Sequence, residues 1–342
     1  MALITRILPI LKEVPPGVVW KLKHPFWFLT HDWRPIRPEW FHPFAANFEG
    51  CPPERAEREF AELDADSRRA AADYLARCEV IRKLCSLPLE PECFLCDYTR
   101  LRGRILRTPA VTFAVRRARR RWGFADGGAD ALLYQQGVAL LPDAVKCYLN
   151  RGEGTVFIDA GAHVGHGTLP LLQYGPKRIY AFEPSAISGG KLLHHLKRNR
   201  IPEETVEWVR AGLSSRCGEV SFADGGGAGQ RLDGEAGGER VPVTTLDAFA
   251  SGFTVPVGLL KTDVEGMNVE LLRGAPETLR RDRPVLALSI YHTPEEFFGS
   301  YALLRRTLTD YRYRIVDLPP GSCYEITLLG WPREAEDGRF SV

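Results

Sequence analysis

Acidic residues stand at the ends of three short β-rich runs in the second half of the chain. Asp159 closes the run TVFIDA, and Glu183 closes the run RIYAFE. Asp263 follows the run VGLLKT, and Glu265 stands two residues further on. A carboxylate at a strand end can accept ribose hydroxyls or neutralise a bound cation. These residues therefore predict a site for a small nucleoside-like ligand that carries positive charge.

A glycine-rich turn begins directly after the first of these acids. Gly161 turns the chain, Gly165 and Gly167 let the backbone approach a ligand closely, and a helix is expected from Thr168. His163 occupies the place of the second glycine in the G-x-G-x-x-G turn of dinucleotide-binding proteins. With an acid beside it, this turn disfavours a pyrophosphate and favours a ligand with an ammonium and a sulfonium group.

Two residues are candidates for removing a proton from an acceptor molecule. Asp263 follows the fourth β-rich run and His292 follows the fifth, in SIYHTPEE, so both should overhang the ligand. Histidine is the commonest general base. One alternative is that His292 only precedes a helix that Thr293 caps and Pro294 opens. Another is a divalent metal ion, held by Asp263 and Glu265, that polarises the acceptor.

The elements that would hold these residues alternate between strand and helix. Five β-rich runs, TVFIDA, RIYAFE, VEWVRAGL, VGLLKTDV and VLALSIY, are separated by segments of helical period. This alternation predicts an α/β fold with a mostly parallel sheet covered on both faces. YRYRIVDL and CYEITLLGW add an antiparallel hairpin around the turn 319–321, which makes seven strands. The third run continues to Ser214, which we expect beside the base of a bound nucleoside.

The first 150 residues differ in composition from the rest. The run 53–87 is rich in Ala, Glu and Arg and predicts one long helix, or two helices divided near Asp64. The Gly-rich residues 224–239 are expected to form a flexible surface loop. The units predicted are an aromatic and Pro-rich segment (1–52), a helical region (53–150), the α/β domain (151–333) and a tail (334–342).

Composition narrows the functional class. The 342 residues are 44% hydrophobic and 26% charged, as in a soluble globular protein. The net charge is only +2, so nothing global argues for a nucleic-acid partner. No window reaches the roughly 18 uninterrupted apolar residues of a membrane-spanning helix, and we find no signal peptide. The eight cysteines are too dispersed for a disulfide framework, so we expect a cytoplasmic protein.

Two local features of the sequence could bind additional partners. The basic cluster Arg116–Arg121 and the aromatic segment 18–48 could contact a membrane surface or a partner protein, although a solvated helix face and internal packing are the favoured alternatives. Four cysteines lie close enough in sequence to hold zinc, but lack a second CxxC pair, so free or buried thiols are favoured. These cysteines are Cys78, Cys85, Cys93 and Cys96. We predict no metal in the site.

The motifs, in their order along the chain, resemble the FkbM family of methyltransferases. They are IDAGAHVGHGTL, YAFEPS, KLLHHLKRN, VTTLDAF and LLKTDVEGMNVELLRGAPETL, and the resemblance runs from about Tyr134 to Pro332. Two positions depart from the family pattern. His163 stands where the family usually has Asn, and Asn268 stands where Glu is usual.

This resemblance implies a Rossmann-like class I methyltransferase domain that uses S-adenosyl-L-methionine. It also implies O-methylation of a hydroxyl on a sugar, glycan or secondary metabolite. The alternatives are a metal-assisted O-methyltransferase and a degenerate cofactor-binding partner subunit. With the motifs above, it predicts catalysis by Asp263 and His292. The predicted cofactor-binding residues are Asp159, Gly161, His163, Gly165, Thr168, Glu183, Ser214 and Asp263.

Overall fold

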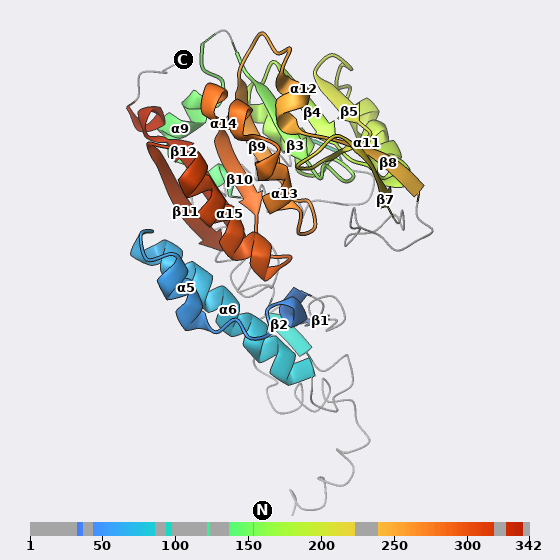
Figure 1. Cartoon of the computed structure of the whole chain (residues 1–342). Helices are drawn as coiled ribbons and strands as arrows, with labels where there is room; N and C mark the ends of the chain where they lie inside the picture. Colours follow the sequence, from blue (N-terminus) through green and yellow to red (C-terminus); the bar gives the residue numbers. More distant parts are fainter. Residues whose placement is uncertain are drawn as a thin grey trace, which may run out of the picture.

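The computed structural model describes residues 33–36, 44–85, 94–97, 122–123, 137–152, 154–222, 239–317 and 326–337 (Figure 1). The basic cluster Arg116–Arg121, most of the aromatic segment and the turn at 319–321 lie outside the described residues. The same is true of the Gly-rich segment up to its last residue and of the end of the tail. Predictions about these segments stay predictions.

A seven-stranded sheet forms the centre of the molecule (Figure 1). Its strand order is β11-β12-β10-β9-β3-β4-β5, and β12 runs antiparallel to both of its neighbours. The other pairings, from β10 to β5, are parallel. The predicted mostly parallel sheet with a terminal antiparallel hairpin is therefore confirmed. The strands are β3 (Val156–Ala160), β4 (Arg178–Phe182), β5 (Val206–Val209), β9 (Val257–Thr262), β10 (Val285–Ser289), β11 (Tyr311–Asp317) and β12 (Ile326–Pro332).

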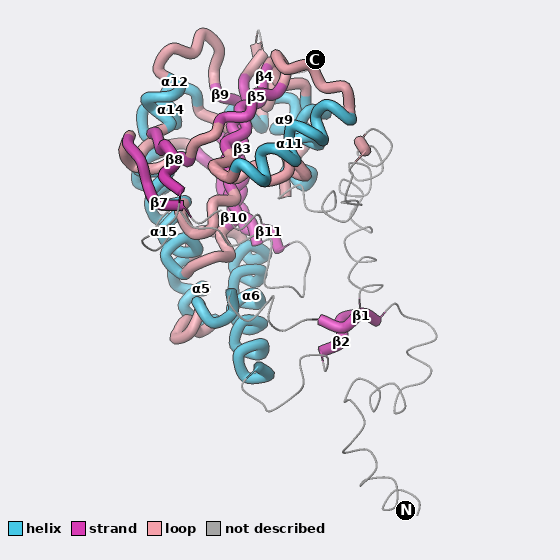
Figure 2. The backbone as a smooth tube through the Cα atoms, turned by 90° about the vertical axis from the view of Figure 1, so that its right-hand side faces the viewer, coloured by secondary structure: helices cyan, strands magenta, loops and turns pink. Residues whose placement is uncertain are grey.

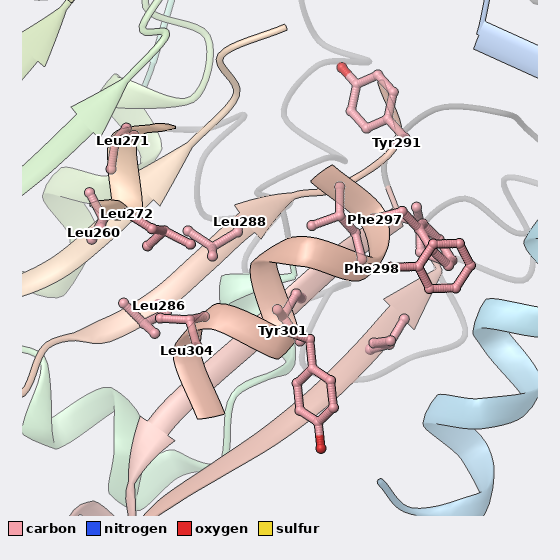
Figure 3. Close-up of a cluster of buried hydrophobic side chains, with 14 of the residues drawn as sticks. Leu260, Leu271, Leu272, Leu286, Leu288, Tyr291, Phe297, Phe298, Tyr301 and Leu304 are labelled. Atoms are coloured by element: carbon pink, nitrogen blue, oxygen red, sulfur yellow. The ribbon is translucent and has the colours of Figure 1, made fainter. Parts of the chain in front are cut away.

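Helices cover both faces of this sheet, so β3, β9 and β10 have every side chain buried. Helices α12 to α15 share one hydrophobic cluster with Leu260, Leu286 and Leu288 of the sheet. Figure 3 shows these leucines beside Phe297 and Leu304 of α15. Helices α9 to α11 cover the other face. The helices are α9 (Asp143–Tyr148), α10 (Thr168–Leu171), α11 (Ala186–Arg198), α12 (Leu246–Ala250), α13 (Asn268–Arg273), α14 (Pro276–Asp282) and α15 (Pro294–Thr307), with 3₁₀ turns η3 (Val138–Leu140), η4 (Leu172–Tyr174) and η5 (Arg333–Glu336).

A second, smaller sheet corrects one prediction. The run VEWVRAGL, predicted as a single strand, leaves the large sheet after Val209, where the amide of Ala211 bonds back to its carbonyl. Gly212 then pairs with Val243 of another sheet. The Gly-rich loop was also predicted one residue too long, because Glu239 begins a strand. The small sheet has the order β6-β8-β7, with β6 (Gly212–Leu213), β7 (Gly218–Phe222) and β8 (Glu239–Thr244).

Two helices precede the sheet and are divided at Asp64, as one of the two predicted alternatives required. They are α5 (Pro53–Glu59) and α6 (Ala65–Cys85). The Asp64 carboxylate accepts a hydrogen bond from the amide of Ser67 at 2.8 Å, which satisfies a free donor of the first helical turn. An isolated antiparallel pair, β1 (Trp33–Ile36) and β2 (Phe94–Asp97), completes the described elements.

Helices α5 and α6 pack beside α15 and the edge strand β11 (Figures 1 and 2). The Ser67 hydroxyl accepts a hydrogen bond from the amide of Ile315 at 3.0 Å. Arg77 of α6 forms an ion pair with Asp317 at 2.8 Å. The two helices thereby cover a strand edge that would otherwise present unpaired backbone groups. None of the described helices combines the length and the apolar character needed to cross a membrane.

Candidate active site

The sheet brings the three predicted strand-end acids to one edge. Strand β3 lies between β9 and β4, and Ala160 is in register with Phe182 on one side and Thr262 on the other. Glu183 and Asp263 are the residues that directly follow these two partners. Because the three strands are parallel, their carboxyl ends and the acids that follow them meet on the same side of the sheet.

Asp159 lies at this edge but is fully buried, and its carboxylate contacts other side chains of the protein. One oxygen accepts a hydrogen bond from the Thr168 hydroxyl at 2.6 Å. The other lies 2.7 Å from the Lys261 ammonium, which is 5% exposed. Lys261 also donates to the carbonyl of Gly161 at 3.1 Å. The predicted ligand acid thus holds the start of α10 and the glycine turn together.

The glycine turn is packed too tightly for side chains at two positions. Gly161 has a φ of +77°, and a Cβ there would lie 1.9 Å from the carbonyl oxygen of Asp263. Gly165 has a φ of +86° and faces the Leu192 side chain at similarly short range. Both positions therefore require glycine. This close approach also places the turn directly against Asp263.

His163 has a φ of +49°, unusual for a residue with a side chain. Loss of water contact around the ring, and then the neighbouring His166, lower the pKa of His163. The ring is therefore neutral at neutral pH and adds no positive charge to the turn.

Glu183 joins the glycine turn to the end of β4. One of its oxygens accepts a hydrogen bond from the amide of His163 and the other from the amide of Ser185, both at 2.8 Å. Its side chain is largely buried, with 6% of the residue exposed. Each carboxylate oxygen has a second lone pair, so the residue can still accept hydrogen bonds from ligand hydroxyls.

His292 lies at the centre of a group of acidic side chains. Its Nδ1 lies 2.7 Å from a carboxylate oxygen of Glu296. Its Nε2 lies 3.3 Å from Asp263 and 3.5 Å from Glu265. The Tyr291 hydroxyl donates to Asp263 at 3.2 Å. The imidazole is 3% exposed, whereas Asp263 and Glu265 are 24% and 21% exposed, so the group opens to solvent on its acidic side.

These contacts set the charge of the group. Burial alone would lower the pKa of His292, but Glu296, Asp263 and Glu265 outweigh burial and raise it well above the ordinary value. Burial also opposes ionisation of Asp263, yet the hydrogen bond from His292 and the other nearby donors and cations lower the pKa of Asp263. The free protein thus holds an imidazolium ion beside carboxylates at neutral pH.

Sequence reasoning missed Glu296 as a member of this group. Thr293 caps α15 by accepting a hydrogen bond from the amide of Glu296 at 3.1 Å. In a capping box the glutamate would return to the amide of the cap residue. Glu296 instead bonds the amide and the ring of His292, at 3.2 and 2.7 Å. The i, i+4 spacing from His292 was the available signal, but the run TPEE reads as an ordinary helix start.

Residues 159–315 match the model of the methyltransferase FkbM domain. This chain contains an FkbM methyltransferase domain. The match confirms the predicted family, the methyltransferase class of the domain and S-adenosylmethionine as its methyl donor. The matched residues include the strand-end acids, His292 and Glu296.

Several solved structures resemble the chain. A methyltransferase FkbM from Methylobacillus flagellatus is 18% identical over 67% of this chain and 60% of its own, with a TM-score of 0.42. A putative O-methyltransferase from Klebsiella pneumoniae is 10% identical over 67% and 94%, with a TM-score of 0.38. A putative methyltransferase from Streptococcus mutans, in complex with SAH, is 12% identical over 55% and 93%, with a TM-score of 0.34. The chain thus spans less than two thirds of the Methylobacillus protein. No curated protein matches the sequence.

Two further positions of the FkbM domain are placed by the structure. Ser214 directly follows β6, and its amide donates to the carbonyl of Thr244 in β8 at 2.9 Å, so the backbone of Ser214 is bonded to the small sheet. Its predicted contact with the cofactor stays a prediction. Asn268 is buried and donates to the carbonyl of Ser289 at 2.6 Å. An ionised glutamate, which has no donor, could not form that bond.

The structure also bears on the metal hypotheses. Within the described part of the chain, no group of three or more His, Cys, Asp or Glu side chains is arranged to hold a metal ion. Cys78 is buried in the cluster that joins α6 to the FkbM domain. The other three cysteines of the hypothetical zinc cluster have side chains outside the described residues.

Proposed function

We propose that this protein is an S-adenosylmethionine-dependent methyltransferase that transfers the methyl group to a hydroxyl oxygen of a sugar, glycan or secondary metabolite. The observation that carries the proposal is the edge at which the glycine turn, Glu183 and Asp263 meet. The carbonyl of Asp263 packs directly against Gly161. A ligand that lies along the turn therefore reaches the group around His292.

The residues of this edge fit the cofactor. Glu183 would accept the ribose hydroxyls, since a carboxylate oxygen can accept more than one hydrogen bond and this carboxylate already lies against the His163 and Ser185 amides of the turn. Asp263, which is partly exposed, would face the positive charge of the methionine part. S-adenosylmethionine, when bound, supplies an electrophilic methyl group. Asp159 acts indirectly, because its hydrogen bond to Thr168 holds the turn in shape.

The acceptor would approach from the exposed, acidic side of the group. Asp263 and Glu265 can accept hydrogen bonds from neutral hydroxyls, and Lys261, a nearby cation, is paired with Asp159. This charge distribution suits a hydroxylated acceptor and disfavours a polyphosphate. Proton removal falls to Nε2 of His292, which must first lose its own proton. Glu296 fixes the ring through Nδ1 so that Nε2 faces the acceptor side.

The state of the cysteines bears on the cellular setting of the protein. Four cysteines in the described residues, Cys51, Cys78, Cys147 and Cys217, are not in disulfides. Free thiols suit the reducing conditions of the cytoplasm, so we place the enzyme there. The near-neutral charge agrees with a small-molecule or glycan acceptor rather than a nucleic acid.

Transfer of a labelled methyl group from S-adenosylmethionine to a panel of sugars, oligosaccharides and hydroxylated metabolites tests the proposal by mass spectrometry. The wild type should methylate at least one acceptor, and His292→Gln should lose most of this activity while still binding the cofactor. His194→Gln, at an exposed position on α11, is the matched control and should retain full activity. Cofactor binding without turnover on any acceptor would favour the degenerate partner subunit instead.

A further inference from the structure

Residues far upstream of the FkbM domain contact the segment that carries His292. Strand β10 ends at Ser289 and α15 begins at Pro294, so Tyr291 and His292 lie in a short connection between the two elements. In Figure 3, Tyr291 stands beyond the end of the strand that carries Leu286 and Leu288. This connection belongs to neither a strand nor a helix, and other parts of the chain must hold it in place.

Two side chains from the N-terminal region bond its carbonyl groups. The Asn47 amide donates to the carbonyl of His292 at 2.7 Å. The Tyr74 hydroxyl donates to the carbonyl of Tyr291 at 3.0 Å. The partners are 245 and 217 residues apart in sequence. Consecutive backbone carbonyls of the connection are therefore both bonded by one distant region of the chain.

Aromatic packing holds Tyr74 in place and adds further contacts between the N-terminal region and the connection. The ring of Tyr74 stacks on Phe297 of α15 at 5.5 Å, and Phe48 meets it edge-on at 5.3 Å. Phe44, one turn before Phe48, lies 5.5 Å from the ring of Tyr291. Its ring is also 5.9 Å from the imidazole of His292. The N-terminal region thus contacts both the backbone and the ring of the histidine.

We propose that Asn47 and Tyr74 are positioning residues of the methyl-transfer site, which hold the Tyr291–His292 backbone so that the imidazole stays between Asp263, Glu265 and Glu296. The inference rests on the proposed function for the role of His292. It extends the site beyond the residues 159–315 that match the FkbM domain.

The geometry of the imidazole explains why its backbone needs support. Glu296 fixes one ring nitrogen, while the other lies at 3.3 and 3.5 Å from the acids of the β9–α13 connection. Those distances are at the limit of direct interaction. A small shift of the Tyr291–His292 connection away from the β9–α13 connection would separate the imidazole from Asp263 and Glu265. The contact between the imidazole and Glu296 would remain. Among the N-terminal side chains that contact the connection, Phe44 and Asn47 cannot titrate, and Tyr74 directs its hydroxyl at the carbonyl of Tyr291.

The pKa of His292 reports this positioning directly, and it can be measured without an acceptor molecule. Histidine NMR signals of the wild type would be followed against pH, and the signal absent from His292→Gln would identify the residue. In Asn47→Ala and Tyr74→Phe, we expect the pKa of His292 to be lower than in the wild type, because Asp263 and Glu265 no longer lie close to the ring while Glu296 stays attached. Asn47 is exposed, so its replacement creates no cavity.

Tyr311→Phe provides a matched control for Tyr74→Phe. Tyr311 is also buried, and its hydroxyl donates to the carbonyl of Pro284 at 3.0 Å, just before β10 begins. Its removal should lower the melting temperature to a similar extent and leave the titration of His292 unchanged. If His292 titrates as in the wild type in both Asn47→Ala and Tyr74→Phe, the two residues are merely structural and the inference is wrong.

Calorimetry with S-adenosylmethionine separates this result from the fate of the proposed function. Absence of cofactor binding in the wild type would overturn the methyltransferase proposal, whereas the NMR titration would still decide whether Asn47 and Tyr74 position His292. Should Tyr74→Phe fail to fold, the exposed Asn47→Ala variant decides the question alone.

Discussion

Asp159 lies near the end of β3 and Asp263 directly follows the neighbouring strand β9, yet their carboxylates have opposite surroundings. Asp159 is fully buried and paired with Lys261, whereas Asp263 is partly exposed beside His292. A strand end fixes where an acid lies along the sheet, but its partner comes from a neighbouring strand. The position of both acids could therefore be predicted from the sequence, and the pairing of Asp159 with Lys261 could not.

Replacement of Asp159 by Asn should destabilise the protein strongly. Lys261 would remain buried without its counter-ion, which typically costs about 3–5 kcal/mol. Chemical denaturation would measure the free energy of unfolding. The double variant Asp159→Asn, Lys261→Met removes both charges and should recover part of the loss. A single variant that unfolds like the wild type would show that the buried pair contributes little.

The charge of His292 predicts an alkaline activity profile. A protonated imidazole cannot accept a proton, and the pKa of His292 is raised, so activity should rise with pH through that raised value. The same raised pKa stabilises the fold at low pH, and this contribution is lost as pH rises through the folded-state value.

Removal of one acid tests this explanation of the profile. In Glu265→Gln the imidazolium ion loses one counter-charge, so the acidic limb of the rate profile should move to lower pH. Glu295→Gln, at an exposed position in the first turn of α15, should leave the limb in place. An acidic limb that is identical in wild type and Glu265→Gln would show that His292 does not control it.

At the scale of elements, period and length were sufficient for the large sheet, but they left open one or two helices before it, and the structure has two, α5 and α6. Period and length failed at β6, because VEWVRAGL is equally β-rich on both sides of the turn at Ala211, and only the pairing of Gly212 with Val243 separates the two strands. The same limit applies to the site. Glu296 and Asn47 act through contacts made only once α15 and the N-terminal region have packed.

The break between α5 and α6 depends on a helix cap that can be tested alone. Asp64→Ala removes the side-chain acceptor for the Ser67 amide and should cost about 1 kcal/mol of unfolding free energy. Asp66→Ala, two residues further along, removes a 91% exposed carboxylate whose ion pair with Arg69 is weak. Equal melting temperatures for the two variants would argue against the cap.

At the scale of the whole molecule, one hydrophobic cluster joins the N-terminal helices to the methyltransferase sheet. The ring of Phe60 lies 5.5 Å from that of Phe297, and Tyr74 stacks on the same ring. The sequence boundary near residue 150 separates motifs of different composition, but packing crosses it. Folding of the N-terminal region and assembly of the site are therefore expected to be linked.

Calorimetric titration with S-adenosylmethionine tests the central claim most directly. The wild type should bind one cofactor per chain, and Glu183→Ala should bind at least about tenfold more weakly, a loss of about 1.4 kcal/mol. Glu207→Ala, which removes an exposed acid of β5 paired with Arg178, should bind like the wild type. Absence of binding in the wild type, or equal affinity in folded Glu183→Ala, would contradict the claim that this edge of the sheet is a cofactor site.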